Sequence, residues 1–153
     1  MNPGNKITFI DRDGTIIYEP QDTYQIDSLE KLKILPNTVE GLRRIQKDGY
    51  KLVMVTNQDG LGKASFSRDA FETVQNALLS SLKEQGITFY RIFICPHTLQ
   101  DNCACRKPKT GLVSEFLKSE PIDYEKSFVV GDRESDVELA KNIGVRAYRM
   151  ETN

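Results

Sequence analysis

The rarest reactive side chains of this 153-residue chain are concentrated in one short segment. Its only histidine and all three of its cysteines are Cys95, His97, Cys103 and Cys105. Three thiols and one imidazole form a complete donor set for tetrahedral Zn²⁺, and a site with four protein ligands is typical of structural zinc. The spacing therefore predicts a zinc-bound loop. The alternative is a group of reduced, buried cysteines beside an incidental histidine.

Carboxylates form a second set of candidate residues. Asp11 and Asp13 follow one apolar run, and Asp132 and Asp136 follow another that ends at Val130. Acids gathered at one place repel one another unless a cation joins them, and oxygen ligands favour a hard cation such as Mg²⁺. The alternatives are an ordinary polar turn for the first pair and, for Asp136, a helix N-terminal acid that complements the helix dipole.

Possible donors to a phosphoryl group lie close to these acids in the expected arrangement. Lys107 follows the cysteine-rich segment directly, while Thr56 and Asn57 come at the end of an apolar run. An ammonium, a hydroxyl and a backbone N–H can all bind phosphate oxygens. Taken singly, Lys107 is typical of the surface and Thr56 of any strand end. Their joint arrangement with the acids is what indicates a phosphate site.

These residues are far apart in the chain, so a scaffold must bring them together. Short apolar runs alternate with segments whose apolar residues recur at helical spacing. The pattern predicts strands at residues 7–10, 51–56, 91–94, 127–130 and 145–148, and helices at about 37–49, 67–86, 110–117 and 135–143, the third helix being capped by Thr110. This alternation is typical of an α/β fold with a mainly parallel sheet and helices on both faces. Active sites in such folds lie beyond the carboxyl ends of the strands, where Asp11, Thr56 and Asp132 fall.

The bulk composition limits the class of protein. Apolar residues make up 39% of the chain and the net charge is −1, which gives no reason to expect binding to nucleic acid or to an anionic membrane. No apolar run approaches the roughly 20 residues of a membrane span, and residues 1–6 lack the features of a signal peptide. Three cysteines cannot all pair within one chain. We therefore expect one cytoplasmic domain over residues 1–153, with thiols kept reduced.

Taken together, the motifs resemble those of haloacid-dehalogenase-superfamily phosphatases over nearly the whole chain. The resemblance rests on D-R-D-G-T at residues 11–15, on the strand that ends at Thr56, on Lys107, and on Asp132 with Asp136. Four motifs in the expected order, each on its expected element, make this a specific signal. It implies a three-layer, Rossmann-like fold and a phosphatase activity.

The resemblance also implies roles for individual residues. Asp11 would attack phosphorus and form an aspartyl-phosphate, and Asp13 would act as general acid and then as general base. Thr56 would bind the phosphoryl group, and Lys107 would offset its negative charge.

The resemblance implies a metal site beside these groups. Mg²⁺ would bind Asp11, Asp132 and the backbone carbonyl of Asp13. Asp136 would not bind the metal directly but would orient Lys107 or a metal-bound water.

Many members of the superfamily cover the site with a large inserted cap domain. Here residues 15–35 and 57–63 leave little room for one. We therefore expect a minimal cap and an open site, with the loop at residues 95–105 as a small rim. Zinc in that loop would fix where Arg106 and Lys107 point.

Two groups of phosphatases in the superfamily carry such a zinc loop, and they act on histidinol phosphate and on heptose 1,7-bisphosphate. The compact C-P-H-x₅-C-x-C-R-K-P run resembles the histidinol-phosphate group more closely. That resemblance implies L-histidinol phosphate as the substrate, in histidine biosynthesis, with D-glycero-D-manno-heptose 1,7-bisphosphate as the alternative. Glu19 would pair with the substrate ammonium, although an exposed loop acid is the simpler interpretation. Asn57, Gln58 and Arg106 are further candidates for substrate contacts.

Other interpretations stay open at this point. In several bacteria this phosphatase is the N-terminal half of a bifunctional enzyme with a dehydratase half, so the 153 residues are either a monofunctional protein or an excised domain. A receiver-type signalling domain also carries acids and a lysine on an α/β sheet, but it lacks a zinc loop. A zinc-ribbon interaction module has no use for acids at strand ends. The sequence does not indicate an oligomeric state.

Overall fold

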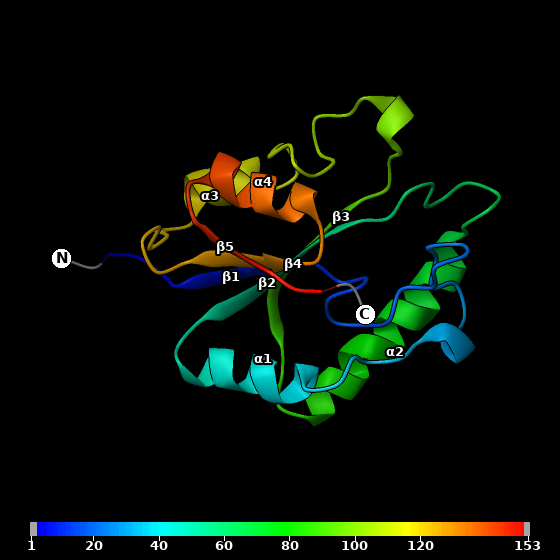
Figure 1. The fold of residues 1–153 in the computed structure, drawn as a ribbon, viewed down its shortest axis with the longest axis horizontal. Helices are drawn as coiled ribbons and strands as arrows, with labels where there is room; N and C mark the ends of the chain where they lie inside the picture. The colour runs from blue at the N-terminus through cyan, green and yellow to red at the C-terminus, as the bar shows by residue number, and fades with distance from the viewer. Residues whose placement is uncertain (1–2, 152–153) are drawn as a thin grey trace.

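A five-stranded parallel sheet forms the middle layer of the computed structural model, which describes residues 3–151 (Figure 1). The strands are β1 (Ile7–Ile10), β2 (Lys51–Asn57), β3 (Phe89–Cys95), β4 (Phe128–Gly131) and β5 (Arg146–Arg149). The α-helices are α1 (Thr38–Lys47), α2 (Arg68–Glu84), α3 (Ser114–Ser119) and α4 (Glu134–Ile143). Short 3₁₀ turns occur at Leu29–Lys31 and Leu99–Asp101. The predicted α/β fold is thus confirmed.

The order of the strands determines where a ligand site can form. They are arranged β3-β2-β1-β4-β5, so the chain leaves β1 toward one edge of the sheet and later returns to pair β4 with its other side. Within β1, Thr8 lies beside Leu52 of β2 and Phe128 of β4. In open parallel sheets, the crevice at such a reversal, beyond the carboxyl ends of the strands, is where ligands bind. Asp11 and Asp132 follow the two strands that flank it.

Each face of the sheet carries a hydrophobic core, because alternate side chains of a strand point to opposite faces. On one face Ile10 and Met54 pack with Leu42 of α1 and with Val74 and other residues of α2. On the opposite face a second cluster joins strands β1, β2 and β4 to helices α3 and α4: Ile7, Phe9, Val53, Val55, Val113, Phe116, Ile122, Val129, Leu139, Ala140 and Ile143. Figure 1 shows α1 and α2 on one side of the sheet and α3 and α4 on the other.

One predicted element begins later than expected. Thr110 was expected to cap a helix, but α3 begins at Ser114, and residues 110–113 form turns instead. The cause is a close approach of two backbones: the Gly111 N–H donates to the Ala104 carbonyl at 2.9 Å. A Cβ atom on Gly111 would lie only 2.3 Å from that oxygen. This contact ties the segment to the cysteine-containing loop, and the helix starts after it.

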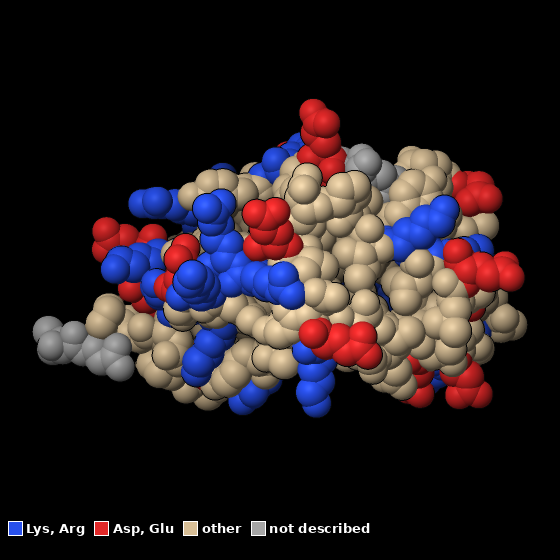
Figure 2. Space-filling view, turned by 90° about the horizontal axis from the view of Figure 1, so that it is seen from below, with Lys and Arg blue, Asp and Glu red and all other residues tan. Residues whose placement is uncertain are grey.

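Charges of both signs are mixed on the surface. Figure 2 shows Lys and Arg side chains gathering on part of one face, with Asp and Glu side chains among and around them. The basic side chains on this face are thus interrupted by acidic ones. Within residues 3–151, none of the helices combines the length and the apolar character needed to cross a bilayer.

Candidate active site

A buried lysine lies at the centre of the crevice. The Lys107 ammonium donates hydrogen bonds to Asp11 Oδ1, to Asp136 Oδ1 and to the Val55 carbonyl, each at 2.8 Å. The residue is only 4% exposed, so it is not the surface lysine that composition alone would suggest. Burial by itself lowers the pKa of Lys107, but the charges of Asp11 and Asp136 outweigh this and raise it. Lys107 is therefore a fixed positive charge at neutral pH.

Three of the predicted acids converge next to this lysine. Carboxylate oxygens of Asp11, Asp132 and Asp136 all lie within 4.8 Å of one another. Two glycines leave room for these carboxylates. A Cβ atom on Gly14, where φ is +84°, would lie 2.4 Å from Asp132 Oδ2, and a Cβ atom on Gly131 would lie 2.2 Å from Asp136. Three buried carboxylates and one lysine leave an excess of negative charge, which a hard divalent cation offsets. The donor set thus fits Mg²⁺.

Asp13 has a partner that we did not predict. Its Oδ1 atom accepts a hydrogen bond from Arg12 Nε at 2.7 Å, and both side chains are buried. Burial raises the pKa of Asp13, while the Arg12 guanidinium and a hydrogen bond from Gln58 oppose the rise. A carboxyl group that is protonated more readily than usual suits a general acid. The sequence signal for Arg12 was its place between the two aspartates, although nothing in the pattern indicated its direction.

The residues at the carboxyl end of β2 support Lys107 from its other side. The Asn57 side chain accepts from the Lys107 N–H at 3.1 Å and donates to the Lys107 carbonyl at 3.5 Å. The Thr56 hydroxyl is buried and donates to Gln58 Oε1 at 2.8 Å. Asn57 therefore holds the lysine backbone, while Thr56 and Gln58 orient each other beneath the site.

Glu19 is buried beside the site rather than exposed in a loop. It is 3% exposed and forms an ion pair with Arg133, a residue that sequence reasoning did not assign. Burial raises the pKa of Glu19 to about 7, and the Arg133 guanidinium opposes the rise. Both residues line a cavity of about 240 Å³ together with Asn57 and Gln58. A carboxyl group that is partly ionised at neutral pH thus lies next to the predicted phosphate position, paired with Arg133.

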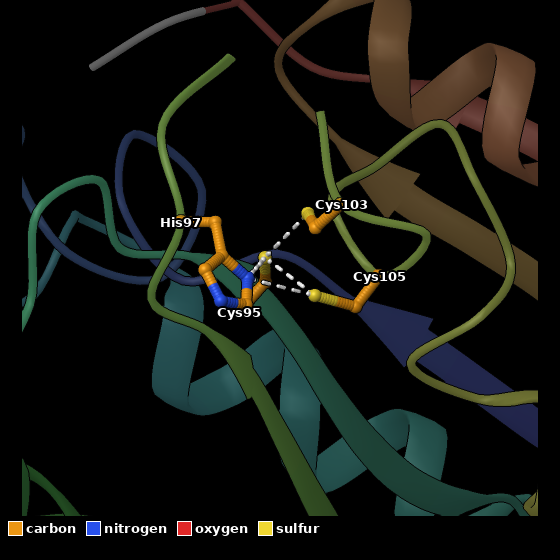
Figure 3. A group of neighbouring side chains, drawn as sticks. All are labelled: Cys95, His97, Cys103 and Cys105. Carbon is orange, nitrogen blue, oxygen red and sulfur yellow. Dashed lines mark hydrogen bonds between the residues drawn. The ribbon is translucent and has the colours of Figure 1, made fainter. Parts of the chain in front are cut away.

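The predicted zinc ligands come together in one cluster. The Sγ atoms of Cys95, Cys103 and Cys105 and the Nδ1 atom of His97 lie within 4.8 Å of one another, and Figure 3 shows the four side chains converging. The Cys95–Cys103 sulfur separation is 3.7 Å, close to the roughly 3.8 Å edge of a tetrahedron with 2.3 Å Zn–S bonds, whereas the Cys95–Cys105 separation of 3.0 Å is shorter than that edge. The Arg106 N–H also donates to Cys103 Sγ at 3.3 Å, as suits a thiolate. The donor set fits Zn²⁺.

The cysteine-containing loop is joined to the rim of the site. Arg106 forms an ion pair with Asp59 at 2.9 Å, which links this loop to the segment after β2. Lys107 follows Arg106 directly, and its ammonium reaches Asp11 from there. Order in the loop therefore determines where the central lysine lies. Arg106 itself is committed to Asp59 and does not line the cavity beside Glu19.

Replacing Cys103 by Ser tests whether the loop at residues 95–105 binds zinc through four protein ligands. We expect zinc content to fall well below one ion per chain, and the free energy of unfolding to fall by about 2 kcal/mol or more, because structural zinc contributes directly to folding. Atomic absorption and denaturant unfolding measure the two effects, with Ser80→Ala, an exposed residue on α2, as a neutral control. One bound zinc with unchanged unfolding in Cys103→Ser would contradict a closed four-ligand site.

Comparison with known sequences agrees with this geometry. A sequence model of the family described as polynucleotide kinase 3 phosphatase matches residues 6–151. The chain is 54% identical over 144 residues to the histidine biosynthesis bifunctional protein HisB of Campylobacter jejuni subsp. doylei, covering 94% of this chain and 41% of that protein. HisB of Actinobacillus pleuropneumoniae is 51% identical over 139 residues, covering 91% of this chain and 38% of that protein. The chain thus spans about two fifths of the length of these relatives.

Solved structures share the fold. D,D-heptose 1,7-bisphosphate phosphatase from B. bronchiseptica, crystallised with magnesium and phosphate, superimposes with a TM-score of 0.86 at 26% identity, covering 97% of this chain and 82% of that one. A HAD-like phosphatase from Mesorhizobium loti gives a TM-score of 0.81 at 27% identity, covering 94% of this chain and 71% of that one. The first of these neighbours shows that the architecture accommodates a metal together with phosphate.

Proposed function

This chain belongs to the polynucleotide kinase 3 phosphatase family, within the haloacid-dehalogenase superfamily, and on that premise we propose that it hydrolyses L-histidinol phosphate to L-histidinol and phosphate. The observation that carries the proposed chemistry is the position of Lys107, which holds Asp11 at 2.8 Å within the acidic cluster. Neither a receiver domain nor a zinc ribbon accounts for this family match.

The proposed reaction has two steps on one pair of aspartates. A carboxylate oxygen of Asp11 forms a bond to phosphorus while the ester P–O bond breaks, and the leaving alkoxide takes the proton of Asp13. Asp13, now a carboxylate, then removes a proton from the water that attacks the aspartyl-phosphate. Asp11 is released as a carboxylate together with inorganic phosphate, and Asp13 is protonated again.

The remaining residues stabilise and orient the groups that take part in this phosphoryl transfer. Lys107 offsets negative charge where the phosphoryl group meets Asp11, and Asp136 fixes the direction of its ammonium. Asp11, Asp132 and the backbone carbonyl of Asp13 would hold Mg²⁺. When bound, the ion supplies positive charge at the phosphoryl oxygens. Thr56 contributes through Gln58 and the backbone at the end of β2.

Zinc has a structural place in the proposal. All four of its proposed ligands are protein side chains, which fits a closed site with no open position for water. The three cysteines form no disulfide with one another. We place the protein in the cytoplasm, where thiols stay reduced and available to the metal.

The substrate follows from the charge next to the site. Histidinol phosphate carries an ammonium close to its phosphate ester. Glu19 lines the cavity of about 240 Å³ and also a smaller hollow that Asn57 and Lys107 line with it. Charge-assisted hydrogen bonds of this kind are about twice as strong as neutral ones. The two relatives above are both named for histidine biosynthesis, which supports the same substrate.

Replacing Glu19 by Gln tests this contact. The KM for L-histidinol phosphate is expected to rise about tenfold, because one charged hydrogen bond is lost. The KM for 4-nitrophenyl phosphate, which has no ammonium, is expected to change less than twofold. Steady-state phosphate release on both esters measures the difference, and Glu30→Gln, an exposed acid elsewhere, is the control. An equal rise on both esters would show that Glu19 does not recognise the ammonium.

The structural similarity to the heptose bisphosphate phosphatase supports a second candidate substrate. Rates of the unmodified protein on L-histidinol phosphate and on D-glycero-D-manno-heptose 1,7-bisphosphate separate the two. We expect kcat/KM to be at least about 100-fold higher on histidinol phosphate. A preference for the heptose bisphosphate would overturn the assigned substrate and leave the phosphatase chemistry in place.

A further inference from the structure

Arg12 is a charged residue with a fully buried side chain, and the reaction as described gives it no part. It has no exposed surface, although an arginine has five N–H donors and is rarely buried without partners. Its Nη2 atom has no hydrogen-bond acceptor within the described part of the chain. Burying a guanidinium at this cost calls for a function that a smaller apolar residue in the same place would not perform.

Arg12 connects helix α2 to Asp13 through hydrogen bonds at both ends of its guanidinium. Its Nη1 atom donates to Gln75 Oε1 at 2.9 Å, and its Nε atom donates to Asp13 Oδ1 at 2.7 Å. The face of the guanidinium lies on the ring of Phe71, with Cζ 4.8 Å from the ring centroid. Phe71 and Gln75 are one helical turn apart, so both project from the same side of α2. Gln75 is held in turn by a contact to Met54 in β2.

This arrangement distinguishes the two oxygens of Asp13. A guanidinium can only donate, so Asp13 Oδ1 accepts from Arg12, and this favours a proton of the carboxyl group on Oδ2 over one on Oδ1. Gln58 also forms a hydrogen bond with this carboxyl group. The planar fork of arginine also restrains the rotation of the carboxyl plane. We propose that Arg12, held by Gln75 and Phe71, is a positioning residue that makes Oδ2 the atom that passes the proton to the leaving group. This inference rests on the proposed function, in which Asp13 protonates the leaving alkoxide.

The test compares two leaving groups. An alkoxide such as that of L-histidinol phosphate needs a proton as the ester bond breaks, whereas the weakly basic nitrophenolate of 4-nitrophenyl phosphate does not. The parameter kcat/KM covers the steps up to alcohol release, so it reports this transfer directly. Arg12→Lys is expected to lower kcat/KM about 100-fold on histidinol phosphate and less than tenfold on 4-nitrophenyl phosphate, within the range of general acid catalysis.

Three variants make the outcome decisive. Asp13→Asn is the reference for loss of the acid and is expected to show the same selectivity, more strongly. Gln75→Leu removes the distant acceptor of Arg12 together with the contact of Gln75 to Met54. It is expected to lose about fivefold on histidinol phosphate alone, and it replaces Arg12→Lys in the test if that variant does not fold. Arg91→Lys, an exposed arginine bonded to a backbone carbonyl, is the matched control.

The outcomes separate the two proposals. If Asp13→Asn is selective but Arg12→Lys and Gln75→Leu lose activity equally on both esters, Arg12 has only a packing role and this inference is overturned. If Asp13→Asn itself loses equally on both, the general acid assignment fails and Arg12 loses its role with it. Selective loss in Asp13→Asn, Arg12→Lys and Gln75→Leu, with Arg91→Lys unchanged, supports the positioning role.

Discussion

Replacing Asp11 by Asn is expected to lower the turnover of L-histidinol phosphate by about 10⁴-fold or more while the protein stays folded. An amide has no anionic oxygen with which to attack phosphorus, and loss of a nucleophile has effects on this scale. The side chain keeps its shape, and its amide oxygen can still accept the hydrogen bond that Lys107 donates at 2.8 Å. Phosphate release with saturating Mg²⁺ measures turnover, and thermal unfolding measures the fold.

The control for this variant is a neutralised aspartate elsewhere. Asp69 is exposed at the start of α2, and Asp69→Asn is expected to keep turnover within twofold of the unmodified protein. Mg²⁺-dependent turnover above about 1% in a folded Asp11→Asn protein would exclude Asp11 as the nucleophile, because general electrostatic effects do not replace a covalent step.

Replacing Lys107 by Met is expected to damage both the fold and the reaction. The variant leaves Asp11 and Asp136 buried without their shared cation, and breaking a buried ion pair from one side costs about 3–5 kcal/mol. Denaturant unfolding without Mg²⁺ should show a loss of about that size. Added Mg²⁺ should restore part of it, because a cation then stands again among the acids. Turnover is expected to fall at least about 10³-fold.

An exposed lysine provides the matched control for this change. Lys118 lies exposed on α3, where its ammonium is 3.8 Å from Glu115, so Lys118→Met should change the free energy of unfolding by less than about 0.5 kcal/mol. Unchanged stability in Lys107→Met would show that the three-way contact of the ammonium contributes little to the fold. Unchanged turnover would remove Lys107 from the reaction.

The placement of the site could be predicted because it depends on where strands end. β1 ends at Ile10 and β4 at Gly131, as the apolar runs indicated, so Asp11 and Asp132 meet beyond neighbouring strands. The four proposed zinc ligands from Cys95 to Cys105 also lie together, since residue type and short spacing leave few other arrangements.

What could not be predicted depends on contacts between segments without a repeating pattern. Glu19 lies in a stretch with no apolar period, and its burial against Arg133 follows from how that loop folds over the site. The direction of Arg12 depends on Gln75, which is 63 residues away. The late start of α3 follows from the contact between Gly111 and Ala104, which a local capping rule for Thr110 does not include.

The covalent intermediate on Asp11 is the central claim, and trapping it is the most direct test. The protein is mixed with L-histidinol phosphate and Mg²⁺, quenched in acid within milliseconds, digested and examined by mass spectrometry. We predict a phosphoryl group on the peptide that contains Asp11, which disappears on longer incubation and is absent in Asp11→Asn. A phosphoryl group on another residue, or quenched samples that turn over substrate without any phosphorylated peptide, would contradict it.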